Sequence, residues 1–206
     1  MVREDKSYTE EEAHILDMML MLHADHGGGN NSTFTCRCVS STGTDTYSAI
    51  AAAIGSLKGP LHGGANAKVM EMFGHVKSNV ADYKDDDEIR AYLTKLLDGK
   101  TGDESGKIYG LGHAVYTVSD PRAVTIKKYA RQLAADKGRL EDLELMESVE
   151  RIGIELIMKR KNMTIPMCAN VDMYSGLIYS MLGIPVELYT PLFAIARSAG
   201  WCAHRM

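Results

Sequence analysis

The stretch DDDEIRAYLTKLLDG (residues 85–99) carries the signals of an amphipathic helix at both of its ends. The acidic run at its start suits the positive end of a helix, and Gly99 favours termination. Four apolar residues recur at i, i+3, i+4 and i+7, as on one face of a helix: Ile89, Tyr92, Leu93 and Leu96. The stretch therefore predicts a helix that buries one face.

Similar signals recur along the chain. Asp120 as a cap, with Pro121 in the first turn, predicts the start of a helix that stops at Gly138. In all, further helices are expected at residues 15–22, 69–76, 120–138, 140–161 and 191–202. Because no segment shows the sustained apolar-polar alternation of a strand, we predict an all-α fold.

Composition excludes several classes of function. The 206 residues, 45% of them hydrophobic, can bury a core. The 23 Lys and Arg against 27 Asp and Glu give a net charge of -4 without a long basic block, which argues against nucleic acid as a partner. No apolar run reaches the roughly 18 residues that span a bilayer, and the N-terminus is polar. We therefore expect a cytoplasmic protein without a membrane partner.

The four cysteines fit neither a disulfide framework nor a paired zinc motif, and we expect reduced thiols. Cys36 and Cys38 do follow His23 and His26 closely, so a metal-binding module is an alternative. A gap of one residue between two cysteines is poor chelating geometry, however. We expect no metal site.

Two histidine-bearing segments lie between the expected helices in the first part of the chain. In the segment 23–30, a helix ends in three glycines that let backbone approach a ligand, although a plain helix C-cap is the alternative. In the segment 59–66, His62 precedes a helix whose N-terminal amides disfavour a protonated imidazole. His62 is therefore expected to be neutral and suited to stabilising an enolate oxygen.

Two further segments carry candidate groups. His113 lies in a glycine-flanked loop, and Arg122 opens the next helix, where its charge opposes the helix dipole. An anion gripped by its guanidinium fork would explain this position, so we expect both residues to serve a ligand rather than the fold. Asp172 either caps a helix starting near Met173 or, in its apolar surroundings, acts as a general base with a raised pKa.

Arg197 is the last candidate. It lies inside the apolar helix expected at residues 191–202. It either extends to solvent or, if buried, needs an anion.

Taken together and in order, these segments resemble the signature segments of the citrate synthase family. The resemblance is carried by HGGAN (62–66), GHAVY (112–116) followed by DPR (120–122), and NVDMYSG (170–176), and it extends through residues 23–30 and 197–205. It implies an all-α, citrate-synthase-like fold and an acyltransferase of the tricarboxylic acid cycle. Such an enzyme condenses acetyl-CoA with oxaloacetate and releases CoA.

The resemblance also implies a role for each candidate. Asp172 would deprotonate the acetyl-CoA methyl group, His62 would stabilise the enolate, and His113 would polarise the oxaloacetate carbonyl. The groups implied to hold oxaloacetate are His26, Arg122 and Arg197. The backbone implied to bind CoA is that of Ile108, Tyr109, Gly110 and Leu111. No cofactor is implied beyond the two substrates.

In the family, a large and a small domain enclose the active site of a homodimer. Transferred to this chain, residues 63–180 would form the small domain, and residues 1–62 and 181–206 would belong to the large one. Family members are about twice as long, so we expect the chain to be a fragment that is inactive alone. Because its large-domain segments would lack their usual partners, we expect self-association.

Three alternatives stay open at this stage. A 2-methylcitrate synthase shares the motifs and uses propionyl-CoA. A metal-binding module and a non-catalytic association module belong to other classes of function. The sequence specifies neither stereochemistry nor allosteric control.

Overall fold

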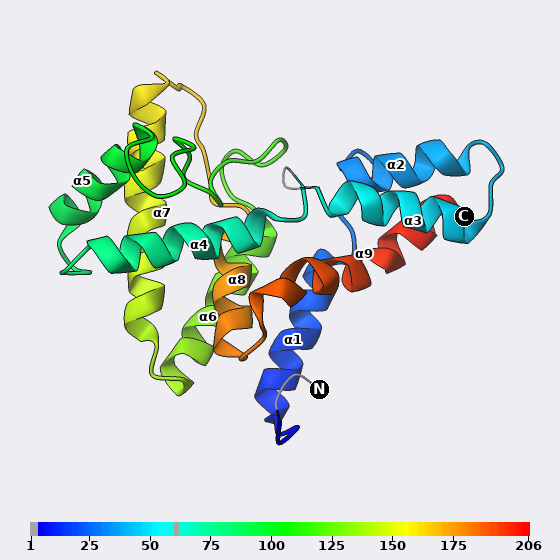
Figure 1. Cartoon of the computed structure of the whole chain (residues 1–206), viewed down its shortest axis with the longest axis horizontal. Helices are drawn as coiled ribbons and strands as arrows, with labels where there is room; N and C mark the ends of the chain where they lie inside the picture. Colours follow the sequence, from blue (N-terminus) through cyan, green and yellow to red (C-terminus); the bar gives the residue numbers. More distant parts are fainter. Residues whose placement is uncertain (1–3, 60–61) are drawn as a thin grey trace. The chain divides into compact units, whose positions relative to one another are not determined.

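The computed structural model describes residues 4–59 and 62–206, so residues 1–3 and 60–61 lie outside the described part of the chain. Within these ranges the regular elements are helices, and the only β-type pairing is one isolated antiparallel bridge (Figure 1). The prediction of an all-α fold is confirmed.

The chain divides into two compact units, and each is considered by itself. Unit 1 consists of Met1–Ala65 with Gly183–Met206, and unit 2 consists of Asn66–Leu182. The names large and small domain, with the boundaries given above, stay predictions.

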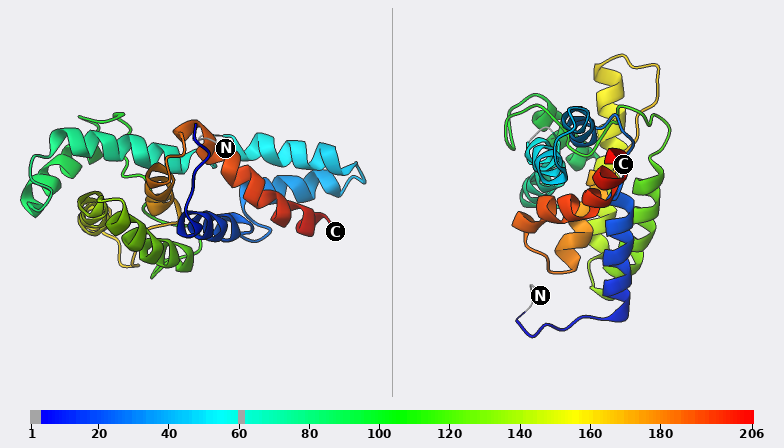
Figure 2. Two further views of the ribbon diagram at one scale, coloured as in Figure 1. Left: turned by 90° about the horizontal axis from the view of Figure 1, so that it is seen from below. Right: turned by 90° about the vertical axis from the view of Figure 1, so that its right-hand side faces the viewer.

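Unit 1 is built from α-helices and one short 3-10 helix, which are α1 (Glu10–His23), α2 (Asn31–Ser40), α3 (Thr46–Leu57), η1 (Val186–Leu188) and α9 (Tyr189–Arg205). Helices α2 and α3 lie side by side, and α9 packs against both (Figures 1 and 2). Their contact forms a buried core of Cys36, Ala49, Ala53, Leu57, Phe193 and Trp201.

Helices α2 and α3 were not predicted from the sequence. Both are short, and α3 is rich in alanine, so neither shows a clear apolar stripe. Their start signals are present, however. The Asn30 side chain accepts a hydrogen bond from the backbone of Thr33, and that of Asp45 accepts one from Ser48 at 2.9 Å, as N-caps do.

Unit 2 contains all but the first residue of α4 (Ala65–Asn79), together with α5 (Asp86–Leu97), α6 (Pro121–Asp136), α7 (Leu140–Arg160) and α8 (Asp172–Met181). The predicted ends are confirmed where capping chemistry is strong. The Asp85 carboxylate accepts from the first amides of α5, and Asp120 caps α6 with Pro121 in its first turn. Gly99, just beyond α5, has φ +67°.

Two loop segments of unit 2 pair with each other in antiparallel fashion. The amide of Gly112 donates to the carbonyl of Cys168 at 2.8 Å, and the amide of Asn170 donates to that of Gly110 at 2.9 Å. Leu111 and Ala169 form the bridge between these two bonds. The pairing places His113 and Asp172 directly after two segments that hold each other.

Gly110 is required by this pairing. Its φ is +82°, and a Cβ added there would lie 2.9 Å from the Cα of Met173 and 2.8 Å from its sulfur. Both the left-handed backbone and the close approach of α8 therefore exclude a side chain.

We predict that Gly110→Ala destabilises unit 2 by at least about 3 kcal/mol, because left-handed strain and overpacking add. Gly138→Ala is the matched control: φ there is +64°, but a new Cβ would meet nothing within 4 Å. It should cost only about 1 kcal/mol. Urea unfolding of both variants measures the difference, and equal losses would contradict the proposed contact with Met173.

Candidate functional site

The first candidate residue of unit 1 is a buried arginine. Arg197 on α9 is 1% exposed, so the alternative in which it extends to solvent is wrong. Its Nε donates to the carbonyl of His23 at 2.6 Å, and its Nη1 donates to the amide oxygen of Asn30 at 3.2 Å. Its guanidinium also lies over the Phe193 ring, 4.7 Å from the centroid. The guanidinium is thus fixed where α1 ends and α2 begins.

His62 lies beside this arginine, and its tautomer follows from its hydrogen bonds. The backbone amide of Ser32, in the first turn of α2, donates to Nε2 of His62 at 3.2 Å. An amide only donates, so Nε2 must be an unprotonated acceptor and a neutral ring carries its proton on Nδ1. Burial and then the charge of Arg197 lower the pKa of His62 below its ordinary value. The expectation of a neutral His62 therefore has a structural basis.

Sequence reasoning missed Ser32 as a partner of His62. Its hydroxyl oxygen lies 2.9 Å from Nε2 of His62, and it accepts a hydrogen bond from the indole of Trp201 at 3.2 Å. Ser32 is completely buried. The only local signal was its place two residues after the Asn30 cap, which does not reveal a contact with a residue 30 positions away.

A tight turn holds His62 in place. Its amide donates to the carbonyl of Gly59 at 3.0 Å, and the next amide, of Gly63, donates to Leu57 at 2.8 Å. A Cβ on Gly63 would lie 2.3 Å from that same carbonyl, so a glycine is required. Thr190 donates to the carbonyl of Gly63 at 3.0 Å, which ties the turn to α9.

His26 lies in the loop between α1 and α2 and is half-buried. Its neighbour Asp25 organises that loop. Burial acts to raise the pKa of the Asp25 carboxyl, but the amides of Gly27 and His26 and a bond from His204 outweigh burial and lower it. The loop is thus held from both ends, by Asp25 on one side and by the Asn30 cap on the other.

In unit 2, His113 carries its proton on the opposite ring nitrogen to His62. The amides of Val115 and Tyr116 donate to Nδ1 of His113 at 2.9 and 3.1 Å. Nδ1 is therefore the acceptor, and the proton of a neutral ring lies on Nε2. Burial and then the Arg122 charge lower the pKa of His113, although Asp120 opposes them.

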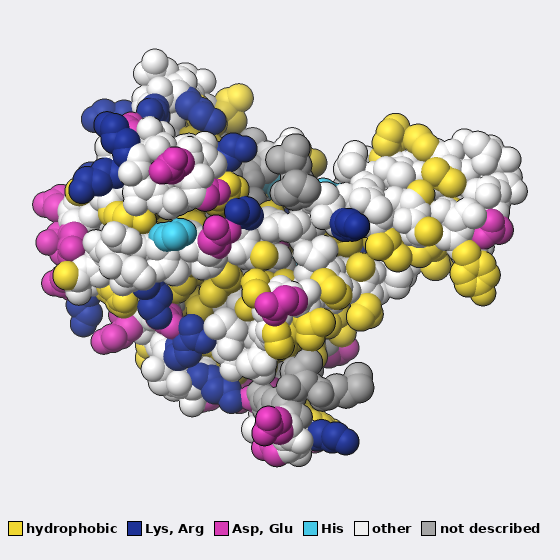
Figure 3. Space-filling model, viewed as in Figure 1, with side chains coloured by type: hydrophobic (Ala, Val, Ile, Leu, Met, Phe, Trp, Pro, Cys, Tyr) yellow, Lys and Arg dark blue, Asp and Glu magenta, His cyan; other side chains and the backbone are white. Residues whose placement is uncertain are grey.

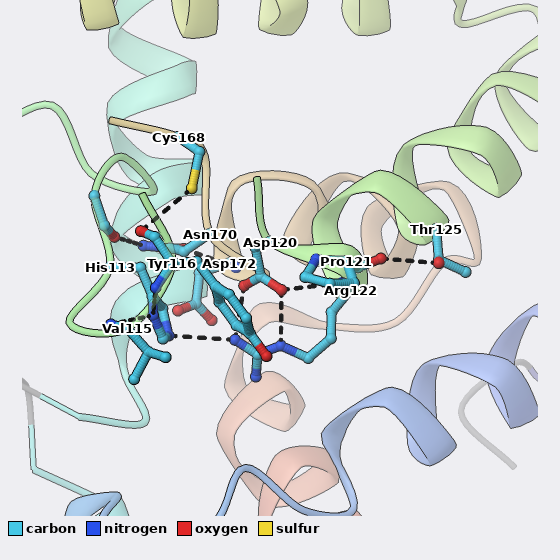
Figure 4. A network of polar contacts seen from close by, with 11 residues as sticks. His113, Val115, Tyr116, Asp120, Pro121, Arg122, Thr125, Cys168, Asn170 and Asp172 are labelled. Carbon is cyan, nitrogen blue, oxygen red and sulfur yellow. Dashed lines mark hydrogen bonds and ion pairs between the residues drawn. The ribbon is translucent and has the colours of Figure 1, made fainter. Parts of the chain in front are cut away.

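Nε2 of His113 lies 3.4 Å from Nη2 of Arg122 (Figure 4). Both atoms carry hydrogens in the tautomer assigned above, so two donors lie close together, although Nη2 also donates to Asp120. An oxygen acceptor placed there would bind both.

The structure corrects the expectation that Arg122 has no part in the fold. Its Nε and Nη2 bind the two carboxylate oxygens of Asp120, at 3.0 and 2.7 Å. Asp120 is completely buried. Burial acts to raise the pKa of Asp120, but its bonds with Arg122 outweigh burial and lower it. Removal of Arg122 alone would leave a buried charge without its partner, so a loss of stability is expected as well.

Asp172 is the first residue of α8 and is half-buried. The helix begins at Asp172 itself, and no side chain caps it from Val171, so the alternative in which Asp172 caps a helix starting near Met173 is wrong. Instead, Asn170 accepts from the Asp172 amide at 3.0 Å and donates to the carbonyl of Gly112 at 2.9 Å. One side chain thus joins the start of α8 to the loop of His113 (Figure 4).

The segment Ile108–Leu111, expected to bind CoA through its backbone, leads into that loop. Tyr109 donates its hydroxyl to Asp103 at 2.6 Å. The carbonyl of Gly110 already accepts from Asn170. Some backbone groups of the segment are therefore committed to the fold.

The donors and acceptors described above fit a reaction in which negative charge develops on oxygen. His62 offers Nδ1–H in unit 1, and His113 with Arg122 offers a donor pair in unit 2. Asp172 joins the network of unit 2 through its backbone amide, at the start of α8. Among the described residues, no group of three or more His, Cys, Asp or Glu side chains could hold a metal ion. Of the two cysteines of the alternative metal-binding module, Cys36 is buried and Cys38 is exposed.

A family model described as "Citrate synthase, C-terminal domain" matches residues 1–206. The chain belongs to the citrate synthase family. It is 43% identical to a citrate synthase of Deinococcus radiodurans, across 95% of this chain and 47% of that protein. It is also 40% identical to a 2-methylcitrate synthase of Shewanella oneidensis, across 93% of this chain and 46% of that protein.

The fold agrees with solved citrate synthases. The enzyme of Thermoplasma acidophilum, in a ternary complex with carboxymethyl coenzyme A and oxaloacetate, superposes with a TM-score of 0.78 at 32% identity. That comparison covers 98% of this chain and 49% of the archaeal one. The chain therefore spans about half the length of the citrate synthases it matches. Among the described residues, no helix is long and apolar enough to cross a membrane.

The lowered pKa values of His62 and His113 predict a stability that depends on pH. Both rings bind a proton less readily in the folded than in the unfolded chain, so the unfolded state takes up more protons below about pH 6.5. The free energy of unfolding should therefore fall as pH is lowered from 7.5 to 5.5.

Urea unfolding at the two pH values, with the double variant His62→Gln, His113→Gln as control, measures this effect. The variant should lose part of the pH dependence. An identical pH dependence in the two proteins would contradict the assignment.

Proposed function

We propose that this chain supplies the catalytic groups of a citrate synthase, which condenses acetyl-CoA with oxaloacetate and water to give citrate and CoA. The observation that carries the proposal is the arrangement in unit 2, where Nε2 of His113 lies 3.4 Å from Nη2 of Arg122. Asn170 joins the loop of His113 to the start of α8 at Asp172. Family membership adds support.

In the proposed reaction, the Asp172 carboxylate removes a proton from the acetyl methyl group. A carbon acid is far weaker than any side chain, so the base works only if the enolate oxygen is stabilised at the same time. His62 donates Nδ1–H to that oxygen. A neutral imidazole suits this role, because its charge state need not change when the enolate forms.

The enolate carbon then attacks the carbonyl carbon of oxaloacetate. Nε2–H of His113 and Nη2 of Arg122 donate to oxygens of oxaloacetate, so that His113 polarises the carbonyl under attack. His26 and Arg197 are proposed to hold its carboxylates. Water hydrolyses the citryl-CoA thioester and releases CoA.

The choice of acyl group remains open between two substrates. The relative from Shewanella oneidensis is a 2-methylcitrate synthase at an identity close to that of the citrate synthases. Propionyl-CoA is therefore the second candidate. Rates with acetyl-CoA and propionyl-CoA, each measured with oxaloacetate, discriminate the two.

The assignment of Asp172 as base predicts the effect of Asp172→Asn. In a full-length protein that carries this sequence, the variant should keep oxaloacetate affinity and lose turnover by at least about a hundredfold. Release of CoA in the presence of oxaloacetate measures turnover, and calorimetry measures affinity. Asp82→Asn, an exposed aspartate in the turn before α5, is the control. Turnover close to that of the wild type in Asp172→Asn would show that Asp172 is not the base.

The 206-residue chain alone is predicted to be inactive, although it holds His62, His113 and Asp172. Catalysis needs reacting groups held to a fraction of an ångström, and a displacement of about 1 Å costs about a hundredfold. The relatives that this chain matches are about twice as long. A CoA-release assay on the purified chain tests the prediction, and appreciable turnover would contradict it.

We also propose that the complete enzyme is a homodimer located in the cytoplasm. The isolated chain is expected to self-associate. Several large apolar side chains of unit 1 are exposed, including Phe34, Tyr47 and Ile195. Such residues favour association. Light scattering of the purified chain tests this expectation, which a clean monomer would contradict.

A further inference from the structure

Helix α8, which begins at Asp172, is held on two opposite sides. On one side it packs against α4 at Gly176, where an added Cβ would lie 2.5 Å from Cγ of Met70 and 3.1 Å from the carbonyl oxygen of Asn66. Residues two positions apart lie about 200° apart around a helix, so Tyr174 faces away from both Asp172 and Gly176. The anchor on the second side is therefore a tyrosine that the proposed reaction does not use.

The hydroxyl of Tyr174 joins α8 to two other helices. Tyr174 is 1% exposed, and its hydroxyl donates to Oε2 of Glu150 on α7. Nζ of Lys127 on α6 lies 3.0 Å from the same oxygen and 5.3 Å from the centroid of the Tyr174 ring. Burial and then the charge of Glu150 raise the pKa of Tyr174, so the hydroxyl keeps the proton that it donates. One carboxylate oxygen thus connects α6, α7 and α8.

Two further ion pairs beside this contact are open to solvent. Arg131 pairs with Glu147 at 2.6 Å, and Nζ of Lys127 lies 3.6 Å from the same carboxylate. Figure 3 shows basic and acidic side chains interspersed over the surface of unit 2. Exposed pairs of this kind contribute little to stability, because water and salt screen them. They join α6 to α7, and it is the buried hydroxyl of Tyr174 that extends the group to α8.

Helices α6 and α8 also carry groups of the candidate site. Arg122 lies in the first turn of α6, and Asp172 opens α8 (Figure 4). If α8 turned about its axis, the carboxylate of Asp172 would move relative to the donors of His113 and Arg122. A displacement of about 1 Å costs about a hundredfold in rate, so the orientation of α8 matters for the base.

We propose that Tyr174 is a positioning residue, which sets the direction of the Asp172 carboxylate by holding the opposite side of α8 through Glu150. Tyr174 contacts no substrate in this arrangement and acts through Asp172 alone. The part of the inference that concerns proton removal rests on the proposed function, in which Asp172 is the base. The structural part, that loss of the hydroxyl moves Asp172, is measurable without any activity.

The kinetic test is Tyr174→Phe in a full-length protein that carries this sequence. The variant keeps the ring beside Lys127 and loses only the hydroxyl. The kcat for CoA release should fall about tenfold, as a displacement of less than about 1 Å would cause, and KM for oxaloacetate should stay within about twofold. With acetyl-CoA deuterated in its methyl group, the isotope effect on kcat should rise, because proton removal by Asp172 becomes the slower step.

Two variants separate positioning from a loss of stability. Glu150→Gln keeps an oxygen that can accept from Tyr174, so its kcat should stay closer to wild type than that of Tyr174→Phe. Tyr83→Phe removes the hydroxyl that donates to the carbonyl of Lys77 at 3.3 Å, away from α8, and should leave kcat within about twofold. A lowered Tm in Tyr174→Phe with unchanged kcat and isotope effect would overturn the proposal.

NMR of the purified 206-residue chain tests the structural part by itself. The carboxyl carbon signal of Asp172, assigned by its loss in Asp172→Asn, should shift in Tyr174→Phe and stay in place in Tyr83→Phe. Such a shift, together with a full-length wild type that does not condense the substrates, would refute the proposed function and leave the positioning role standing. An unshifted signal in Tyr174→Phe would overturn the positioning role whatever the activity.

Discussion

The antiparallel pairing of the loops at 110–112 and 168–170 is the constraint on which the arrangement of unit 2 depends. Two backbone hydrogen bonds and the Asn170 side chain hold these loops together, although they are almost 60 residues apart. Each loop leads directly into a functional segment. Main-chain pairing therefore fixes where the segments that carry His113 and Asp172 begin.

Main-chain amides also decide the chemistry of the two histidines. In His62 an amide at the start of α2 donates to Nε2, whereas in His113 two loop amides donate to Nδ1. The free energy of these bonds selects opposite tautomers in two neutral rings. Each ring then carries its N–H on the nitrogen that these amides do not bind, where it can donate to developing negative charge.

Residues with strong local signals were predictable from the sequence. The acidic start of α5 and the Asp120-Pro121 start of α6 specify helix ends through local capping, so these ends agree with the structure. Helices α2 and α3 lack an amphipathic stripe, because their buried face is made of small residues such as Ala49 and Ala53. Local periodicity does not detect such a face.

Candidate residues could be named from the sequence, but their partners could not. The sequence predicts that Arg122 serves a ligand rather than the fold, and the structure shows that it also binds the buried carboxylate of Asp120, two residues earlier. Ser32 meets His62 across 30 positions, and Arg197 reaches the end of α1 across more than 170. These contacts depend on tertiary packing, which sequence patterns do not encode.

The most direct test of the account is the protonation of the two histidine rings in the purified chain. Long-range proton–nitrogen NMR at pH 7.5 reports which ring nitrogen carries the hydrogen, and the variants His62→Gln and His113→Gln assign the signals. The account predicts neutral rings, with the proton of His62 on Nδ1 and that of His113 on Nε2. A charged ring, or the reverse tautomer at either position, would contradict it.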